Sequence, residues 1–95
     1  MEIKKNVEDE LNKQINCEFN AAYLYLSMAA YFEGLNLKGF SHYMKKQAEE
    51  ELNHGMKIFD YAVDRKGTVV LESIEKPNAA WKSVLEAVQG ALGHE

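Results

Sequence analysis

Three residues of this sequence have side chains that bind divalent metal ions, at a spacing that could bring them together. Glu51 and His54 are three residues apart in the stretch QAEEELNHGM, so on a helix both project from one face. Glu18 lies further upstream, in a gap of an otherwise apolar pattern. Carboxylates and a neutral imidazole are natural metal ligands, and a bound cation offsets the cost of burying them. The pattern therefore predicts a metal site, although Glu-x-x-His also occurs by chance and a histidine on such a face is often a core residue.

Two long amphipathic helices are expected to position these residues. Apolar side chains recur at three- and four-residue steps, which predicts helices over residues 6–33 and 37–66. Asn6 is the expected cap of the first helix, and Gly34 and Gly67 are the expected stops. The first apolar stripe comprises Val7, Leu11, Ile15, Ala22, Tyr25, either Met28 or Ala29, and Phe32. The second comprises Phe40, Met44, Gln47, Glu51, His54, Ile58 and either Tyr61 or Ala62.

The short EGLN connection predicts that the two helices form an antiparallel hairpin. We expect an extended crossover over residues 67–82, with a short strand as the alternative, and a short third helix over 83–95 begun by a Ser83/Glu86 capping box. The whole chain, 1–95, is then a single all-α domain. Two long amphipathic helices cannot cover each other's apolar faces, so we expect a second chain to complete a four-helix bundle.

Composition narrows the classes of partner. The chain has 95 residues, a net charge of −4 and no block of Lys or Arg, which disfavours nucleic acid. The longest nearly apolar stretch, residues 21–32, is too short to cross a bilayer as a helix, so no membrane segment is expected. A single cysteine and a start without the features of a secretory signal predict a cytoplasmic location.

The sequence also resembles a known family. The stretch LNKQINCEFNAAYLYLSMAAYFEGLNLKGFSHYMKKQAEEELNHGMKIFDYAVDRKG resembles the first two helices of a prokaryotic ferritin. The segments VVLESIEKP and ALGHE resemble the crossover and the start of the third helix of that family. The resemblance covers the N-terminal half of a ferritin and implies a di-iron protein.

The resemblance also implies roles for individual residues. Glu18 and His54 match ligands of the first iron, Glu51 matches the carboxylate that bridges both irons, and Tyr25 matches a tyrosine beside the centre. Glu95 matches a ligand of the second iron, and Glu50 matches a carboxylate of a nearby third site. The ligands that the family takes from its fourth helix have no counterpart here. A homo-oligomer, in which a second copy supplies a second Glu and Glu-x-x-His set, would complete the site.

The resulting prediction is a ferroxidase that oxidises Fe(II) to Fe(III) with dioxygen and contributes to iron storage or detoxification. The alternative is a catalytically inactive helical oligomer stapled by zinc or another ion, or a structural ferritin fragment. Zinc and manganese are the expected substitutes for iron at such ligands. Haem is disfavoured, because Leu52 stands where the related bacterioferritins have a haem-binding methionine.

Overall fold

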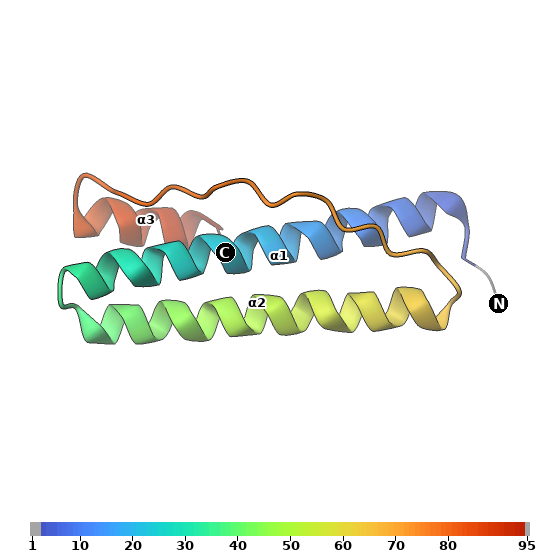
Figure 1. The fold of residues 1–95 in the computed structure, drawn as a ribbon, viewed down its shortest axis with the longest axis horizontal. Helices are drawn as coiled ribbons and strands as arrows, with labels where there is room; N and C mark the ends of the chain where they lie inside the picture. Colours follow the sequence, from blue (N-terminus) through green and yellow to red (C-terminus); the bar gives the residue numbers. More distant parts are fainter. Residues whose placement is uncertain (1–2, 95) are drawn as a thin grey trace.

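The computed structural model describes residues 3–94, and within that range the chain forms three α-helices (Figure 1). Helix α1 spans Lys5–Gly34, α2 spans Lys38–Asp64 and α3 spans Val84–His94. No residue between 3 and 94 belongs to a β-strand, which confirms the predicted all-α class. The bounds of α1 and α2 and the start of α3 differ from the predicted 6–33, 37–66 and 83 by one or two residues.

Backbone hydrogen bonds, rather than the expected caps, close the ends of the hairpin helices. α1 begins at Lys5, so Asn6 lies inside its first turn and is not the cap. The residues with left-handed backbone are Asn36 (φ 59°) and Lys66 (φ 61°), not Gly34 or Gly67. The closing bonds run from Leu37 N to the Phe32 carbonyl (2.9 Å) and from Gly67 N to the Ala62 carbonyl (2.8 Å). Both ends therefore form Schellman motifs, in which a single left-handed residue reverses the chain.

α1 and α2 pack side by side along a seam with a seven-residue repeat. On α2 most of the buried residues are small and recur every seven positions: Ser41, Ala48, Gly55 and Ala62. On α1 the buried residues include Ile15, Ala22 and Ala29, with Tyr25 and Phe32 on the adjacent repeat. Glu18 lies seven residues before Tyr25, and Glu51 lies seven after the buried Met44. The repeat therefore carries both carboxylates toward the interface of the two helices.

The seam is narrower than the predicted apolar stripes. Val7 and Phe40 are 41% and 43% exposed, although both were expected to face inward. Of the two alternatives at the end of the second stripe, Ala62 is buried and Tyr61 is 45% exposed. The centre of the α2 seam passes through the positions of Gly55 and Ala62, so neighbouring positions of the stripe reach only its edge. A single hairpin cannot cover faces this wide.

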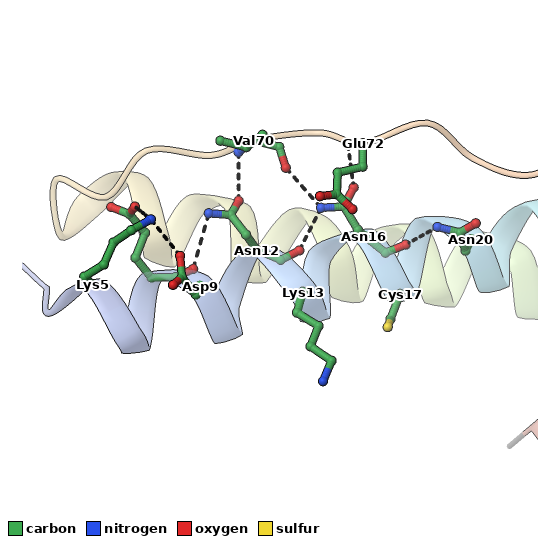
Figure 2. Close-up of a pocket in the computed structure, with 10 residues that line it drawn as sticks. Lys5, Asp9, Asn12, Lys13, Asn16, Cys17, Asn20, Val70 and Glu72 are labelled. Carbon is green, nitrogen blue, oxygen red and sulfur yellow. Dashed lines mark hydrogen bonds and ion pairs between the residues drawn. The ribbon is translucent and has the colours of Figure 1, made fainter.

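Hydrogen bonds from α1 hold the crossover between α2 and α3 (Figure 2). Asn12 donates from Nδ2 to the Thr68 carbonyl (2.9 Å) and accepts at Oδ1 from Val70 N (2.8 Å). Asn16 repeats this arrangement two crossover residues later, donating to the Val70 carbonyl (3.0 Å) and accepting from Glu72 N (2.9 Å). Four helical residues rise about 6.0 Å, which nearly matches two extended residues. This asparagine ladder therefore sets the register of the crossover, which runs back along α1 (Figure 1).

α3 packs on the C-terminal half of α1. Its Ala87 and Ala91 are buried in the same apolar cluster as Tyr25, Met28 and Phe32 of α1. The helix begins where predicted from sequence to within a residue, because Ser83 Oγ accepts a hydrogen bond from Glu86 N (3.1 Å). No helix among residues 3–94 is both long and apolar enough to cross a membrane.

Two apolar grooves stay open along the hairpin. The first, of about 670 Å³, lies between the start of α2 and α3 and is lined chiefly by Leu37, Phe40, Tyr43, Met44, Val88, Ala91 and Leu92. The second, of about 530 Å³, is lined by apolar side chains of both hairpin helices and by Ile74 of the crossover, namely Phe19, Ala22, Tyr23, Leu26, Ala48 and Leu52. Exposed apolar surface of this extent is typical of surfaces that bind another protein.

Candidate metal centre

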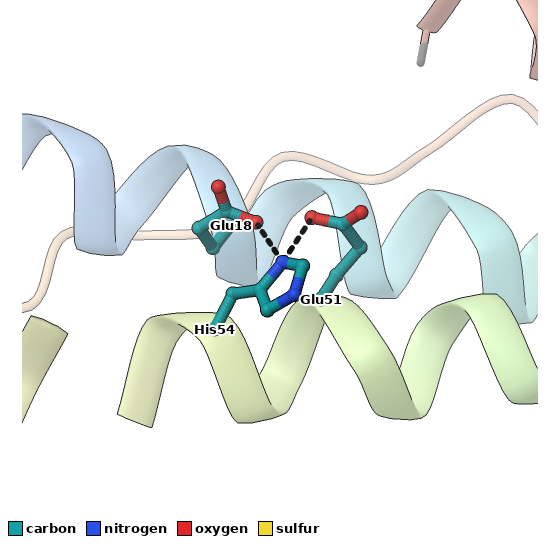
Figure 3. Close-up of side chains that lie close together, drawn as sticks. All are labelled: Glu18, Glu51 and His54. Atoms are coloured by element: carbon teal, nitrogen blue, oxygen red, sulfur yellow. Dashed lines mark ion pairs between the residues drawn. The ribbon is translucent and has the colours of Figure 1, made fainter. Parts of the chain in front are cut away.

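The three residues singled out by their chemistry come together between α1 and α2 (Figure 3). Glu18 projects from the middle of α1, and Glu51 and His54 project from α2, one turn apart. Each offers one ligand atom, and these atoms lie within 4.8 Å of one another. His54 Nδ1 is 3.9 Å from Glu18 Oε2 and 3.9 Å from Glu51 Oε2. We call these three residues the Glu–Glu–His cluster.

The spacing of the ligand atoms suits an ion better than direct hydrogen bonds. At 3.9 Å the imidazole nitrogen is too far from either carboxylate oxygen to donate a hydrogen bond. Two ligands at about 2.1 Å from one ion are at most about 4.2 Å apart. Small side-chain rotations therefore suffice to bring all three donor atoms onto a single divalent cation.

One carboxylate oxygen of the cluster lacks a hydrogen bond. Glu18 Oε2 is buried and accepts none from any residue in the described range 3–94. Its other oxygen, Oε1, accepts one from Gln14 Nε2 at 2.7 Å, which fixes the orientation of the carboxylate. A buried carboxylate oxygen without a partner is costly, and a cation at this position would offset that cost. The residues present therefore fit a metal ion.

The three side chains of the Glu–Glu–His cluster differ in their exposure to solvent. The side chains of Glu18 and Glu51 are only 15% and 20% exposed, whereas that of His54 is 55% exposed. The prediction that His54 faces inward is thus only partly met, because Gly55, and not His54, occupies the seam position. The imidazole closes the cluster from the solvent side.

A small cavity of about 190 Å³ adjoins the two carboxylates. Its lining includes Glu18, Glu51, Gln14 and Tyr25. The structure thus brings the predicted site residue Tyr25, which is 1% exposed, to the wall of the cavity. Sequence reasoning missed Gln14, although its position four residues before Glu18 on one helix face was a usable signal.

Glu50, another predicted site residue, does not join the cluster. Glu50 is exposed on α2 and contributes no ligand atom to the group within 4.8 Å. Glu95 lies outside the residues that the structure describes. The part of the chain described here thus supplies three ligands, fewer than two metal ions need.

A helical hairpin that carries a Glu on one helix and a Glu-x-x-His on the next is half of a carboxylate four-helix bundle. A family model described as "Ferritin-like domain" matches residues 8–95. The chain belongs to the ferritin family, which confirms the resemblance seen in its motifs.

Individual relatives agree with this assignment. The chain is 36% identical over 93 residues to a bacterial non-heme ferritin of Bacteroides fragilis, a match that covers 98% of this chain and 58% of the relative. A bacterial non-heme ferritin of Staphylococcus haemolyticus is 39% identical over 93 residues, with 98% and 56% covered. The crystal structure of an open pore ferritin from Archaeoglobus fulgidus superposes with a TM-score of 0.93 at 47% identity, covering 97% of this chain and 56% of that one. The chain therefore spans little more than half the length of these relatives.

Proposed function

We propose that this chain binds Fe(II) at the Glu–Glu–His cluster and, paired with a second copy, acts as a ferroxidase. The observation that carries the proposal is the buried Glu18 Oε2, which accepts no hydrogen bond from residues 3–94 and lies 3.9 Å from the imidazole of His54. An oxygen in this state gains most from a cation. Membership of the ferritin family supports iron as that cation.

The proposed reaction takes one electron from each of two Fe(II) ions, and dioxygen accepts both. In this scheme Glu51 would be the ligand shared by the two ions, and Glu18 and His54 would each hold one of them. Tyr25 lies on the wall of the adjoining cavity and would contact the reacting centre. Glu50 and Glu95 are proposed as accessory ligands. The protein itself fixes the spacing of the ions and leaves positions open for dioxygen.

A second copy is proposed because one chain offers too few ligands. Two hairpins related by a two-fold axis would present two Glu residues and two Glu-x-x-His pairs, a set that holds two metal ions in four-helix bundles. The open apolar groove between the start of α2 and α3 supports this pairing, since association would bury it. Larger assemblies, and with them a contribution to iron storage, belong to the same proposal.

A second candidate function rests on the number of ligands in a single chain. Three donor atoms within 4.8 Å suit one tetrahedral zinc ion with a water as the fourth ligand. Zinc binds such nitrogen and oxygen sites more tightly than Fe(II) does. In that case the ion staples the hairpin, no electron is transferred, and manganese or zinc serves as well as iron.

Oxidation kinetics distinguish the two functions. Anaerobic protein loaded with Fe(II) is mixed with air-saturated buffer, and the ferric absorbance is followed for the parent, Glu51→Ala and Glu49→Ala. Glu49 is exposed on the same helix and outside the cluster, so its substitution is the matched control. We expect Glu51→Ala to oxidise iron at least about tenfold more slowly and the control to match the parent. Equal rates for all three would falsify the ferroxidase function.

Mass in solution tests the second copy. Light scattering with and without Fe(II) should give a dimer or a larger even-numbered assembly. A monomer under both conditions would contradict the shared site, because a single cluster cannot hold two ions.

A further inference from the structure

The ring of Phe19 on α1 packs directly against Gly55 on α2, next to the Glu–Glu–His cluster. A Cβ atom built on Gly55 would lie 2.8 Å from Phe19 Cδ1 and 3.3 Å from Cζ, and closer still to Cε1. Separations under 3.0 Å do not occur between real side chains without movement of one of them. Gly55 is buried, so a methyl group at this position would point into the protein and not into solvent.

The two residues flank the cluster in sequence and in space. Phe19 follows Glu18 on α1, and Gly55 follows His54 on α2. The other seam residues of α2 at this seven-residue spacing, Ser41, Ala48 and Ala62, all carry a Cβ atom. The seam therefore lacks a side chain only at the level of the cluster, where an aromatic ring from the opposite helix fills the space.

We propose that the Phe19 ring seated on Gly55 fixes the separation of α1 and α2 at the Glu–Glu–His cluster, and that Gly55 is therefore a positioning residue for the metal site. The proposal rests on the proposed metal binding. The distance between two helices depends on the side chains at their contact. Ligands from two helices keep a metal geometry only while that distance is held to about 0.5 Å.

A methyl group at position 55 has two ways to be accommodated. The helices can separate, which moves Glu18 away from His54 and weakens metal binding. Alternatively, the Phe19 ring can rotate into the open groove that it lines, which leaves the helices in place. The first outcome follows from the proposal and the second contradicts it.

The experiment compares Gly55→Ala with Gly39→Ala in the full chain. Both substitutions add one methyl group to α2, but a Cβ atom on Gly39 meets nothing within 4 Å, so Gly39→Ala is the matched control. Co(II) alone is the probe, with its affinity measured by calorimetry and its ligand geometry by visible absorption. We expect Gly55→Ala to bind Co(II) at least about tenfold more weakly, with an altered absorption band, and Gly39→Ala to match the parent.

A second-site variant tests the steric cause. Phe19→Leu in the Gly55→Ala background gives the methyl group room and should restore most of the lost affinity. Equal Co(II) affinity and spectra for Gly55→Ala and Gly39→Ala would overturn the proposal, as would a double variant that binds no better than Gly55→Ala.

Thermal unfolding without metal separates this inference from the proposed function. If the ring acts as a spacer, metal-free Gly55→Ala should unfold at a lower temperature than Gly39→Ala. Adding Phe19→Leu to Gly55→Ala should bring the two unfolding temperatures closer together. Failure of the parent to bind Co(II) at all would refute the metal site, and with it the positioning role, while the stability comparison would still test the steric contact. Unfolding temperatures that are the same for the two alanine variants would refute the spacer itself.

Discussion

The asparagine ladder predicts that Asn16→Ala loosens one defined part of the crossover. The substitution removes the two bonds to the crossover, from Asn16 Nδ2 to the Val70 carbonyl and from Glu72 N to Asn16 Oδ1, together with the bond from Nδ2 to the Asn12 carbonyl within α1. Each of the two bonds to the crossover contributes about 1 kcal/mol net, and the freed backbone groups of the crossover are exposed, so water replaces their partners without a desolvation cost. Alanine recovers about 0.6 kcal/mol of helix propensity. The expected net loss is about 1–1.5 kcal/mol, which lowers the unfolding temperature by roughly 5–10 °C in a domain of this size.

Amide hydrogen exchange, combined with thermal unfolding, locates the effect. In Asn16→Ala the amide of Glu72 loses its acceptor, whereas the amide of Val70 keeps Asn12 Oδ1. Asn12→Ala should reverse this pattern, so each variant should speed the exchange of its own partner by about tenfold. Lys13→Ala, an exposed change between the two asparagines, is the control and should leave both amides protected. Unchanged exchange at Glu72 in Asn16→Ala would show that the ladder does not set the register.

Two further predictions concern the ends of the hairpin helices. Lys66→Gly should raise the free energy of unfolding by about 0.5–1 kcal/mol, because Lys66 has a left-handed backbone that glycine adopts without strain. Urea denaturation measures this change, and an unchanged or lower free energy of unfolding would contradict the role of Lys66 in the turn. The hydrogen bond from Lys38 holds the pKa of Glu33 below its ordinary value. A lowered carboxyl pKa stabilises the fold above the unfolded-state value of about 4.3, and this stabilisation is lost as the pH falls through the lower folded value. Glu33→Gln should therefore flatten the acid limb of a stability–pH curve, and an unaltered limb would count against the Lys38 contact.

Local sequence patterns were sufficient for much of the fold. The three- and four-residue periodicity located both hairpin helices to within two residues, because a helix repeats its faces every 3.6 residues. Ser83 was recognised as the start of α3 because its hydroxyl can accept a backbone N–H three residues later, which it does. α1 does end at Gly34, but α2 ends at Asp64, before the expected stop at Gly67, and the left-handed residues are Asn36 and Lys66. A pattern identifies residues that can end a helix, but the packing of the turn selects among them.

Local sequence patterns also predict one part of the candidate site and leave another part open. The three-residue spacing of Glu51 and His54 places both on one face of α2, whatever the rest of the chain does. Whether Glu18 meets them depends on the register of α1 against α2, which no local spacing encodes. The exposure of His54 follows from the seam centre passing through Gly55, one position further along.

The sequence by itself determined the helical class, the spans of the hairpin helices, the pairing of Glu51 with His54 and the resemblance to ferritins. Only the tertiary structure decided that Glu18 joins this pair, that Gln14 orients the Glu18 carboxylate and that Phe19 fills the space above Gly55. The physical reason is that periodicity assigns each residue to a face of its own helix. The distance and register between two helices depend on the side chains that interlock along the seam, and these become visible only when both helices are in place.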